Sequence, residues 1–257
     1  MTMEALSRAE RHPANQDTTK QFAIRQAREM LAAAGVKDPG SELGASSVAA
    51  SIEKQQTKIE AIKIYPEISL EDEWNRQTQN LARIFAKELK FETTEAYMAT
   101  LPKFEPQPEN WKGRLATPVI VETRINPSRQ CELAGIRYAL DGISKTNWNK
   151  NLKNYTTPKA PYAAWLEDGR NNLNKKPEDV RKNLKDDEIA GTEFDGIALY
   201  IANPKILEHH FLDLPGTAVE SVHAAYLILW HGGPMLSYFF VDRANPEFGS
   251  VVRGRQK

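Results

Sequence analysis

Residues 224–241 carry the strongest structural signal in this sequence, because two apolar runs flank a turn. They read AAYLILW (224–230), HGGP (231–234) and MLSYFFV (235–241). The runs are dominated by aliphatic and aromatic side chains, and the Gly-Gly-Pro segment interrupts regular structure between them. This pattern predicts an antiparallel hairpin with a four-residue loop. Because both faces of each strand are apolar, we expect the hairpin at the centre of a sheet, covered on both sides or nearly so.

The residues before the hairpin alternate between strand and helix patterns. Strands are predicted at 119–125 and 162–166, the second ending at the turn dipeptide Asp168-Gly169, and helices are predicted at 128–140 and 177–184. Thr192 is a suitable cap for a further helix. Asn203-Pro204 should begin a short helix that Leu214-Pro215-Gly216 ends. The predicted class is α+β: a helical N-terminal region followed by a small, mostly antiparallel sheet of about four strands, packed with helices.

The N-terminal third is predicted to be helical. Helices are expected at about 17–35 and 47–63. A third helix is predicted to begin after Ser69, which forms a variant capping box. Its apolar stripe consists of Leu70, Trp74, Thr78, Leu81, Phe85 and Leu89. We expect these helices to pack on one another, with Trp74, Leu81 and Phe85 meeting Phe22 and Met30. The alternative is that the stripe is a surface for a partner.

Composition and spacing divide the chain into four parts. We expect a tail at 1–16, a helical region at 17–100, a linker at 101–110 and an α+β domain at 111–257. The linker is predicted from Leu101 to Pro108, where three prolines in eight residues exclude a helix.

The composition excludes some classes of function. The 257 residues are 40 % apolar and 26 % charged with a net charge of zero, which favours a globular protein and no general affinity for nucleic acid or membrane surfaces. No apolar run approaches the roughly 20 residues that cross a bilayer, and the first 15 residues lack a secretory apolar segment. The single cysteine, Cys131, indicates a reducing, cytoplasmic location. We interpret Cys131 as a helix core residue rather than a nucleophile.

The C-terminal two-fifths, from about Tyr155 to Arg255, resemble a bacterial family described only as a domain of unknown function. The matching residues are Pro161-Tyr162, Trp165, Asp187-Glu188, Gly196 to Leu199, His210, Leu212 to Gly216, Leu229-Trp230, Gly249-Ser250 and Gly254-Arg255. Members often carry a serine–cysteine–glycine run where this chain has Val251-Val252-Arg253, so no cysteine chemistry is expected there. The resemblance implies a bacterial protein and no particular activity.

Residues that could carry chemistry gather near the C-terminus. Four of the five histidines lie between positions 209 and 231. His209, His210 and Asp213 are the candidate catalytic residues, because imidazole and carboxylate side chains serve as acid–base pairs. The alternative is that His210 only fixes a turn, and that Asp213 is an ordinary turn residue. His223 and His231 add no known metal spacing, so no metal site is predicted.

Motifs of common enzymes are missing from the sequence. There is no GxxxxGK[ST], GxGxxG or GxSxG pattern, so no cofactor is predicted. Residues 145–185 mix basic and aromatic side chains, which could bind single-stranded nucleic acid. Six acidic residues from Glu167 to Asp187 dilute that charge, so a solvated surface is the favoured interpretation and nucleic acid an unlikely partner.

Together these observations predict a soluble bacterial cytoplasmic protein that binds an unknown small molecule or protein partner. The first alternative is a small hydrolase-like enzyme whose site gathers His209 or His210 with Asp213, and with Asp242-Arg243 as a further candidate pair. The second alternative is a binder of single-stranded nucleic acid.

Overall fold

The structure of the chain is a computed structural model that describes residues 69–140, 158–219 and 222–255. Ile68–Lys257 form one compact unit, distinct from Met1–Glu67. The predicted tail, the two predicted helices before Ser69, and the proposed contacts of Phe22 and Met30 lie outside the described residues. The predicted boundaries at 17, 101 and 111 stay predictions.

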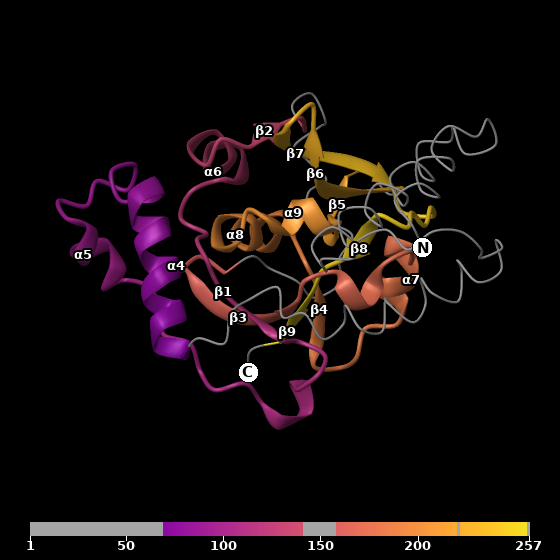
Figure 1. The fold of residues 1–257 in the computed structure, drawn as a ribbon, viewed down its shortest axis with the longest axis horizontal. Coiled ribbons are helices and arrows are strands. Elements are labelled where there is room, and N and C mark those ends of the chain that lie inside the picture. The colour runs from indigo at the N-terminus through magenta and orange to yellow at the C-terminus, as the bar shows by residue number, and fades with distance from the viewer. Residues whose placement is uncertain (1–68, 141–157, 220–221, 256–257) are drawn as a thin grey trace, which may run out of the picture. The chain divides into compact units, whose positions relative to one another are not determined.

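The described residues of the compact unit form two β-sheets (Figure 1). The four-stranded sheet A has the order β1 (Thr117–Val121), β3 (Tyr162–Glu167), β9 (Val252–Gly254) and β4 (Glu188–Ala190). All its pairs are antiparallel. The predicted strand at 162–166 is confirmed as β3, and the strand predicted at 119–125 begins and ends earlier, as β1.

The five-stranded sheet B contains the hairpin. Its order is β2 (Arg137–Tyr138), β7 (Gly233–Phe240), β6 (His223–Trp230), β5 (Phe211–Val219) and β8 (Phe248–Ser250). The central pairs, β7 with β6 and β6 with β5, are antiparallel, whereas the edge strands β2 and β8 pair in parallel. The α+β class is therefore confirmed for the described residues, with two sheets instead of one of about four strands.

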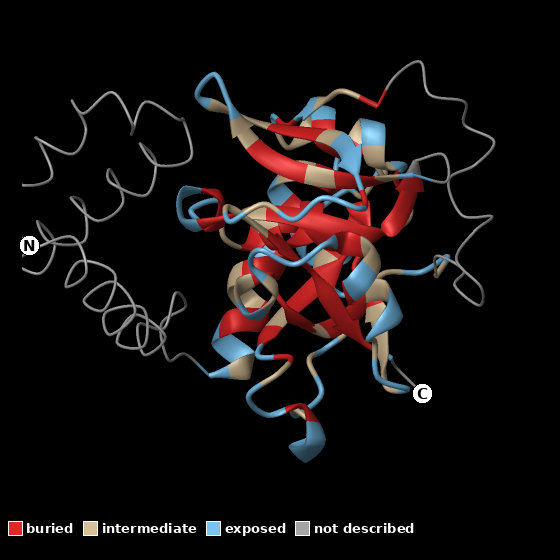
Figure 2. Ribbon diagram, turned by 90° about the vertical axis from the view of Figure 1, so that its right-hand side faces the viewer, coloured by how far each residue is buried: buried red, intermediate tan, exposed pale blue. Residues whose placement is uncertain are grey.

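The predicted hairpin is confirmed, with β6 as the middle strand of sheet B. Its loop is shorter than predicted, because Trp230 pairs with Gly233 and leaves only His231 and Gly232 between the strands. Both loop residues have positive φ, 50° and 80°, as the tight hairpin turn with right-handed twist requires. The expected cover on both sides is incomplete, because the large exposed apolar side chains include Trp230, Tyr238, Phe239 and Phe240. Figure 2 colours the described ribbon by burial, with buried residues concentrated in the interior of the compact unit.

The prediction for Leu214-Pro215-Gly216 is wrong, because these residues lie within strand β5. The preceding helix α9 covers only Ile206–His209, and His210 is already extended. The register with β6 shifts between Leu214 and Ala218, and an irregularity of this kind tolerates a proline. Gly216 donates its N–H to the Gly191 carbonyl at 2.7 Å, and a Cβ at Gly216 would lie 2.3 Å from the Ala190 oxygen. The Pro-Gly pair thus bends β5 against β4 rather than ending a helix.

Helix α8 (Glu193–Ala202) lies between the two sheets (Figure 1). Thr192 begins it through a capping box with Asp195, which confirms the predicted cap. Nine of its ten residues are buried, as expected of a helix that contacts β1 on one side and β5 and β6 on the other. The main apolar core of the unit therefore continues from sheet A through α8 to sheet B.

Helix α4 (Leu70–Phe85) confirms the third predicted helix, although it ends before Leu89. The Ser69 side chain accepts a hydrogen bond from the Asp72 N–H, as its cap role requires. Trp74, Leu81 and Phe85 are buried. Their helix packs against α5 (Thr94–Met98), α8 and β1.

The remaining helices of the described residues are short. Helix α6 (Pro127–Leu133) ends before Gly135, whose φ is +70°, so the helix predicted at 128–140 is too long and its last part forms β2. Helix α7 (Pro177–Lys182) confirms the helix predicted at 177–184. Two 3-10 turns, η2 (Glu109–Trp111) and η4 (Arg170–Asn172), precede β1 and follow β3. Among the described residues, no helix is both long and apolar enough to cross a membrane.

Candidate functional site

Glu167 is the last residue of β3 and is 6 % exposed. Its Oε1 accepts the Asn171 N–H at 2.7 Å, and its Oε2 accepts the Gly169 N–H at 2.9 Å and the Asn172 Nδ2 at 3.0 Å. Burial, helped by the neighbouring Asp168 charge, raises the pKa of Glu167 to about 8. This side chain is therefore an acid that keeps its proton near neutral pH and still has an oxygen with spare hydrogen-bonding capacity.

The turn after Glu167 is held by a close backbone approach. Gly169 has φ +102°, a conformation that side chains disfavour, and it confirms the turn predicted at Asp168-Gly169. A Cβ at Gly169 would lie 2.7 Å from the Gly249 oxygen, and a Cβ at Gly249 would lie 2.0 Å from the Gly169 oxygen. Only glycine fits both positions, so the turn that supplies donors to Glu167 is fixed directly against β8.

A second carboxylate, Glu188, lies on the same face of sheet A. Glu167 pairs in register with Val252 and Glu188 with Gly254, two residues further along β9, and alternate residues of a strand share a face. The Glu188 carboxylate forms an ion pair with Arg114 and accepts the Lys185 N–H at 2.9 Å. Arg114 also pairs with Asp187 at 3.0 Å. Although burial acts against it, hydrogen bonds from Trp111 and Arg114 lower the pKa of Asp187.

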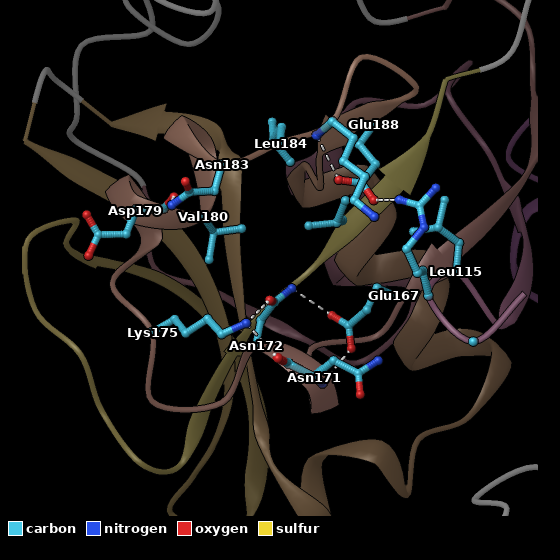
Figure 3. Close-up of a pocket in the computed structure, with 14 residues that line it drawn as sticks. Leu115, Glu167, Asn171, Asn172, Lys175, Asp179, Val180, Asn183, Leu184 and Glu188 are labelled. Atoms are coloured by element: carbon cyan, nitrogen blue, oxygen red, sulfur yellow. Dashed lines mark hydrogen bonds and ion pairs between the residues drawn. The ribbon is translucent and has the colours of Figure 1, made fainter. Parts of the chain in front are cut away.

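These groups line a cleft of about 480 Å³, which we call the Glu167 cleft (Figure 3). Its polar lining includes Arg114, Glu167, Asn171, Asn172, Lys175, Asp179, Asn183, Lys185 and Glu188. Its apolar lining is Leu115, Val180, Leu184 and Val252, which belong with Trp111 to a small apolar cluster separate from the main core. Lys175 Nζ donates to the Asn171 carbonyl at 2.9 Å and to Asn172 Oδ1 at 3.0 Å, which orders the η4 side of the cleft.

The predicted catalytic residues lie outside this cleft. His209 is exposed at the end of α9. His210 is buried, and its Nε2 lies 2.8 Å from the Asp168 carbonyl oxygen. Burial lowers the pKa of His210, although the hydrogen bond to Asp168 opposes the shift.

Asp213 is buried in β5, where burial raises its pKa to about 7. His210 and Asp213 are three residues apart in extended chain, so their side chains leave opposite faces about 10 Å apart along the strand. The structure does not bring these two side chains together, and a catalytic role for His209, His210 or Asp213 stays a prediction. Asp242, from the further candidate pair, is exposed.

The other two histidines of the C-terminal group, His223 and His231, belong to the hairpin. His223 begins β6 and contacts the rings of Tyr238 and Phe240, with centroid distances of 5.2 and 4.6 Å. His231 occupies the turn. In the ranges that the structure describes, no group of three or more histidine, cysteine, aspartate and glutamate residues is arranged to hold a metal ion.

Cys131 is fully buried in α6, in agreement with its interpretation as a core residue. Burial, reinforced by the Glu193 charge, raises the pKa of its thiol to about 12. A thiol with such a pKa is almost entirely protonated at neutral pH and is a poor nucleophile.

Two aromatic residues of the proposed nucleic-acid segment are engaged within the protein. Tyr162 is buried and donates its hydroxyl to Asp195 Oδ1 at 2.8 Å. Trp165 donates its indole N–H to the Glu105 carbonyl at 3.0 Å. Trp148 and Tyr155 lie outside the described residues. The buried Tyr162 therefore offers no free ring for base stacking, and the indole N–H of the partly buried Trp165 is already used within the protein.

A buried polar network connects α8 to both sheets, and no local pattern in the sequence indicates it. Asp195 accepts hydrogen bonds from the Thr192 N–H and hydroxyl and from Tyr162, and it lies 3.6 Å from Arg253 Nε. Glu193 is bonded to Thr217, and burial raises its pKa to about 8. These groups have partners within the core and lie outside the Glu167 cleft, so we infer that they stabilise the fold.

Comparison with known proteins gives no further guidance, because no protein-family model, curated protein or solved structure matches the chain. The resemblance to a bacterial domain of unknown function stays a prediction.

Neither Glu167 nor Glu188 was among the candidate residues. They are separated by 20 residues in the chain and meet only because β9 pairs with both β3 and β4. The one local signal was an acidic residue that ends an apolar strand before a glycine turn, which is a common place for functional side chains.

Proposed function

We propose that this chain is a binding protein that holds a small ligand in the Glu167 cleft. The observation that carries the proposal is a cleft of about 480 Å³ with a buried, hydrogen-bonded glutamate beside apolar side chains. Small-molecule sites typically measure about 300–1,000 Å³ and combine an apolar lining with a few placed polar groups. The single cysteine and the bacterial resemblance support a cytoplasmic bacterial setting as part of this proposal.

The proposal can be tested by blocking the cleft. Asn171 is an exposed lining residue, so Asn171→Trp should fill the cleft without disturbing the core. Gln79→Trp on the exposed side of α4 is the matched control. A broad panel of small metabolites should contain compounds that raise the melting temperature of the unmodified protein and of Gln79→Trp, and not that of Asn171→Trp. Stabilisation that persists in Asn171→Trp would place binding elsewhere and contradict the proposal.

A second candidate function is hydrolysis, and one observation favours it. Two glutamates share the cleft in different states, because Glu167 has a raised pKa and Glu188 is ion-paired with Arg114. Such a difference is how enzymes make one carboxyl group an acid and its neighbour a base. For hydrolysis, this arrangement favours Glu167 and Glu188 as the catalytic pair over His210 and Asp213.

The hydrolase candidate predicts a particular pH dependence. If Glu167 donates a proton, the rate should fall as the pH rises through about 8, and Glu167→Gln should lower kcat by at least a hundredfold. Chromogenic ester and glycoside substrates provide the assay. Binding of a ligand without turnover would exclude hydrolysis and leave the binding function in place.

A further inference from the structure

We infer that the Glu167 cleft binds a neutral, polyhydroxylated ligand such as a saccharide unit. This inference rests on the proposed binding function and adds the chemistry of the ligand. It is based on three properties of the lining: its charges, its hydrogen-bonding groups and its apolar wall.

The charged groups of the cleft are either paired within the protein or exposed to water. Because Glu167 keeps its proton near neutral pH, the charged lining consists of three cationic residues, Arg114, Lys175 and Lys185, and two carboxylates, Asp179 and Glu188. Arg114 is paired with Glu188 and Asp187, and Asp179 lies 3.9 Å from Lys182. Lys175 and Lys185 are exposed and therefore solvated. An ionic ligand would meet no buried, unpaired charge among these groups, and it would lose its own hydration on entry.

The hydrogen-bonding groups include both donors and acceptors. Three asparagine residues, Asn171, Asn172 and Asn183, line the cleft, and a side-chain amide both donates and accepts. Asn183 uses one N–H for the Asp179 carbonyl. From the described part of the chain, Glu167 Oε1 accepts only the Asn171 N–H. Hydroxyl groups also donate and accept, so several of them on one ligand match this mixture better than an ammonium or a carboxylate does.

The apolar wall is suited to the face of a sugar ring. Leu115, Val180, Leu184 and Val252 bring carbon atoms to the same cleft as the polar groups. A saccharide ring presents C–H groups on its faces and hydroxyls around its edge. Such a ligand could therefore contact the apolar side chains and the amides together, which a uniformly polar molecule could not do as well.

The experiment compares three kinds of probe by isothermal titration calorimetry. The probes are neutral saccharides (glucose, N-acetylglucosamine and maltose), a polyamine (spermidine) and an anion (glutamate). We expect at least one saccharide to bind, and its affinity to stay within about twofold between 0.05 and 0.5 M salt, because a neutral ligand has no charge to screen. Asn171→Ala should weaken that binding two- to tenfold, the effect of one lost hydrogen bond, whereas Gln79→Ala should leave it unchanged.

The outcomes separate this inference from the proposed function. Binding of spermidine or glutamate alone, blocked by Asn171→Trp, would overturn the saccharide inference and leave the cleft as a binding site. Saccharide binding that is unaffected by both Asn171→Ala and Asn171→Trp would overturn both proposals. Absence of binding by all three kinds of probe would overturn the saccharide inference, and the metabolite panel would then decide on the cleft itself.

Discussion

At the scale of single residues, the burial of a side chain was easier to predict than its partner. His210 directly precedes the apolar residues Phe211 and Leu212 in the sequence, and it is buried. Its partner, the Asp168 carbonyl, lies 42 positions earlier in the chain and had no local signal. The same holds for Glu167, whose role depends on Asn171 and Asn172 on one side and on strand β9 on the other. A side chain's apolar neighbours are visible in the sequence, whereas contacts across strands depend on a register that the sequence did not reveal.

Asp213 should make the stability of the protein depend on pH. Burial raises its pKa to about 7 in the folded protein, whereas a free aspartate titrates near 3.9. The folded state therefore holds this proton more tightly than the unfolded state. The contribution of Asp213 to the free energy of unfolding is fully present below about pH 4 and is lost as the pH rises through about 7. We expect the free energy of unfolding of Asp213→Asn, relative to that of the unmodified protein, to be on the order of 3 kcal/mol higher at pH 8 than at pH 4. Urea unfolding at the two pH values measures this difference.

The exposed Asp242 provides the control for this prediction. Asp242→Asn should change the free energy of unfolding by less than about 0.5 kcal/mol at either pH. Because Glu167 and Glu193 also have raised pKa values, only the difference between variant and unmodified protein isolates Asp213. A difference for Asp213→Asn that stays constant with pH would show that its carboxyl group does not titrate with folding.

At the scale of elements, apolar periodicity and capping residues predicted helices, and two apolar runs around a turn predicted the hairpin. Short strands were missed. The capping residues Ser69 and Thr192 were identified before α4 and α8. Strands β4, β8 and β9 have only three residues each, which is too short for an alternating pattern to be recognised. Strand β5 contains a Pro-Gly pair that normally indicates a turn. These missed strands explain why the sequence predicted one sheet and the structure contains two.

The packing of α8 on β5 depends on a glycine and can be tested directly. A Cβ at Gly196 would lie 2.7 Å from both Cδ atoms of Leu214. Glycine to alanine inside a helix normally stabilises it by about 1 kcal/mol. Here we expect Gly196→Ala to destabilise the protein by about 1–3 kcal/mol, because the added methyl group overpacks the interface between helix and sheet. Urea unfolding gives the free energy.

A double-mutant cycle distinguishes this clash from other effects of the substitution. Leu214→Ala removes the atoms that the new methyl group would meet, so it should reduce the cost of Gly196→Ala by at least about 1 kcal/mol. If Gly196→Ala stabilises the protein, or if the two substitutions are additive, the close contact between α8 and β5 is not what requires glycine.

At the scale of the whole compact unit, the end of the described chain connects the two sheets. Strand β8 pairs with β5 at the edge of sheet B, Val251 follows, and β9 then enters sheet A between β3 and β4. The Val251 N–H donates to the Asp213 carbonyl, and its own carbonyl accepts the Gly191 N–H. Val251 is fully buried, so this crossing is part of the core rather than a frayed terminus.

Removing this segment should therefore disrupt more than the cleft that it helps to line. A chain that ends at Asn245 lacks β8 and β9, so it leaves β3 and β4 without the strand between them and exposes their backbone hydrogen-bonding groups. We expect this chain to lose cooperative thermal unfolding and the near-UV circular dichroism signal of its packed aromatic residues. A chain that ends at Arg255 keeps both strands and should unfold as the full chain does. If the shorter chain kept a cooperative transition within about 5 °C of the full chain, β9 would be dispensable, and the Glu167 cleft would have to be stabilised by β3 and its turn alone.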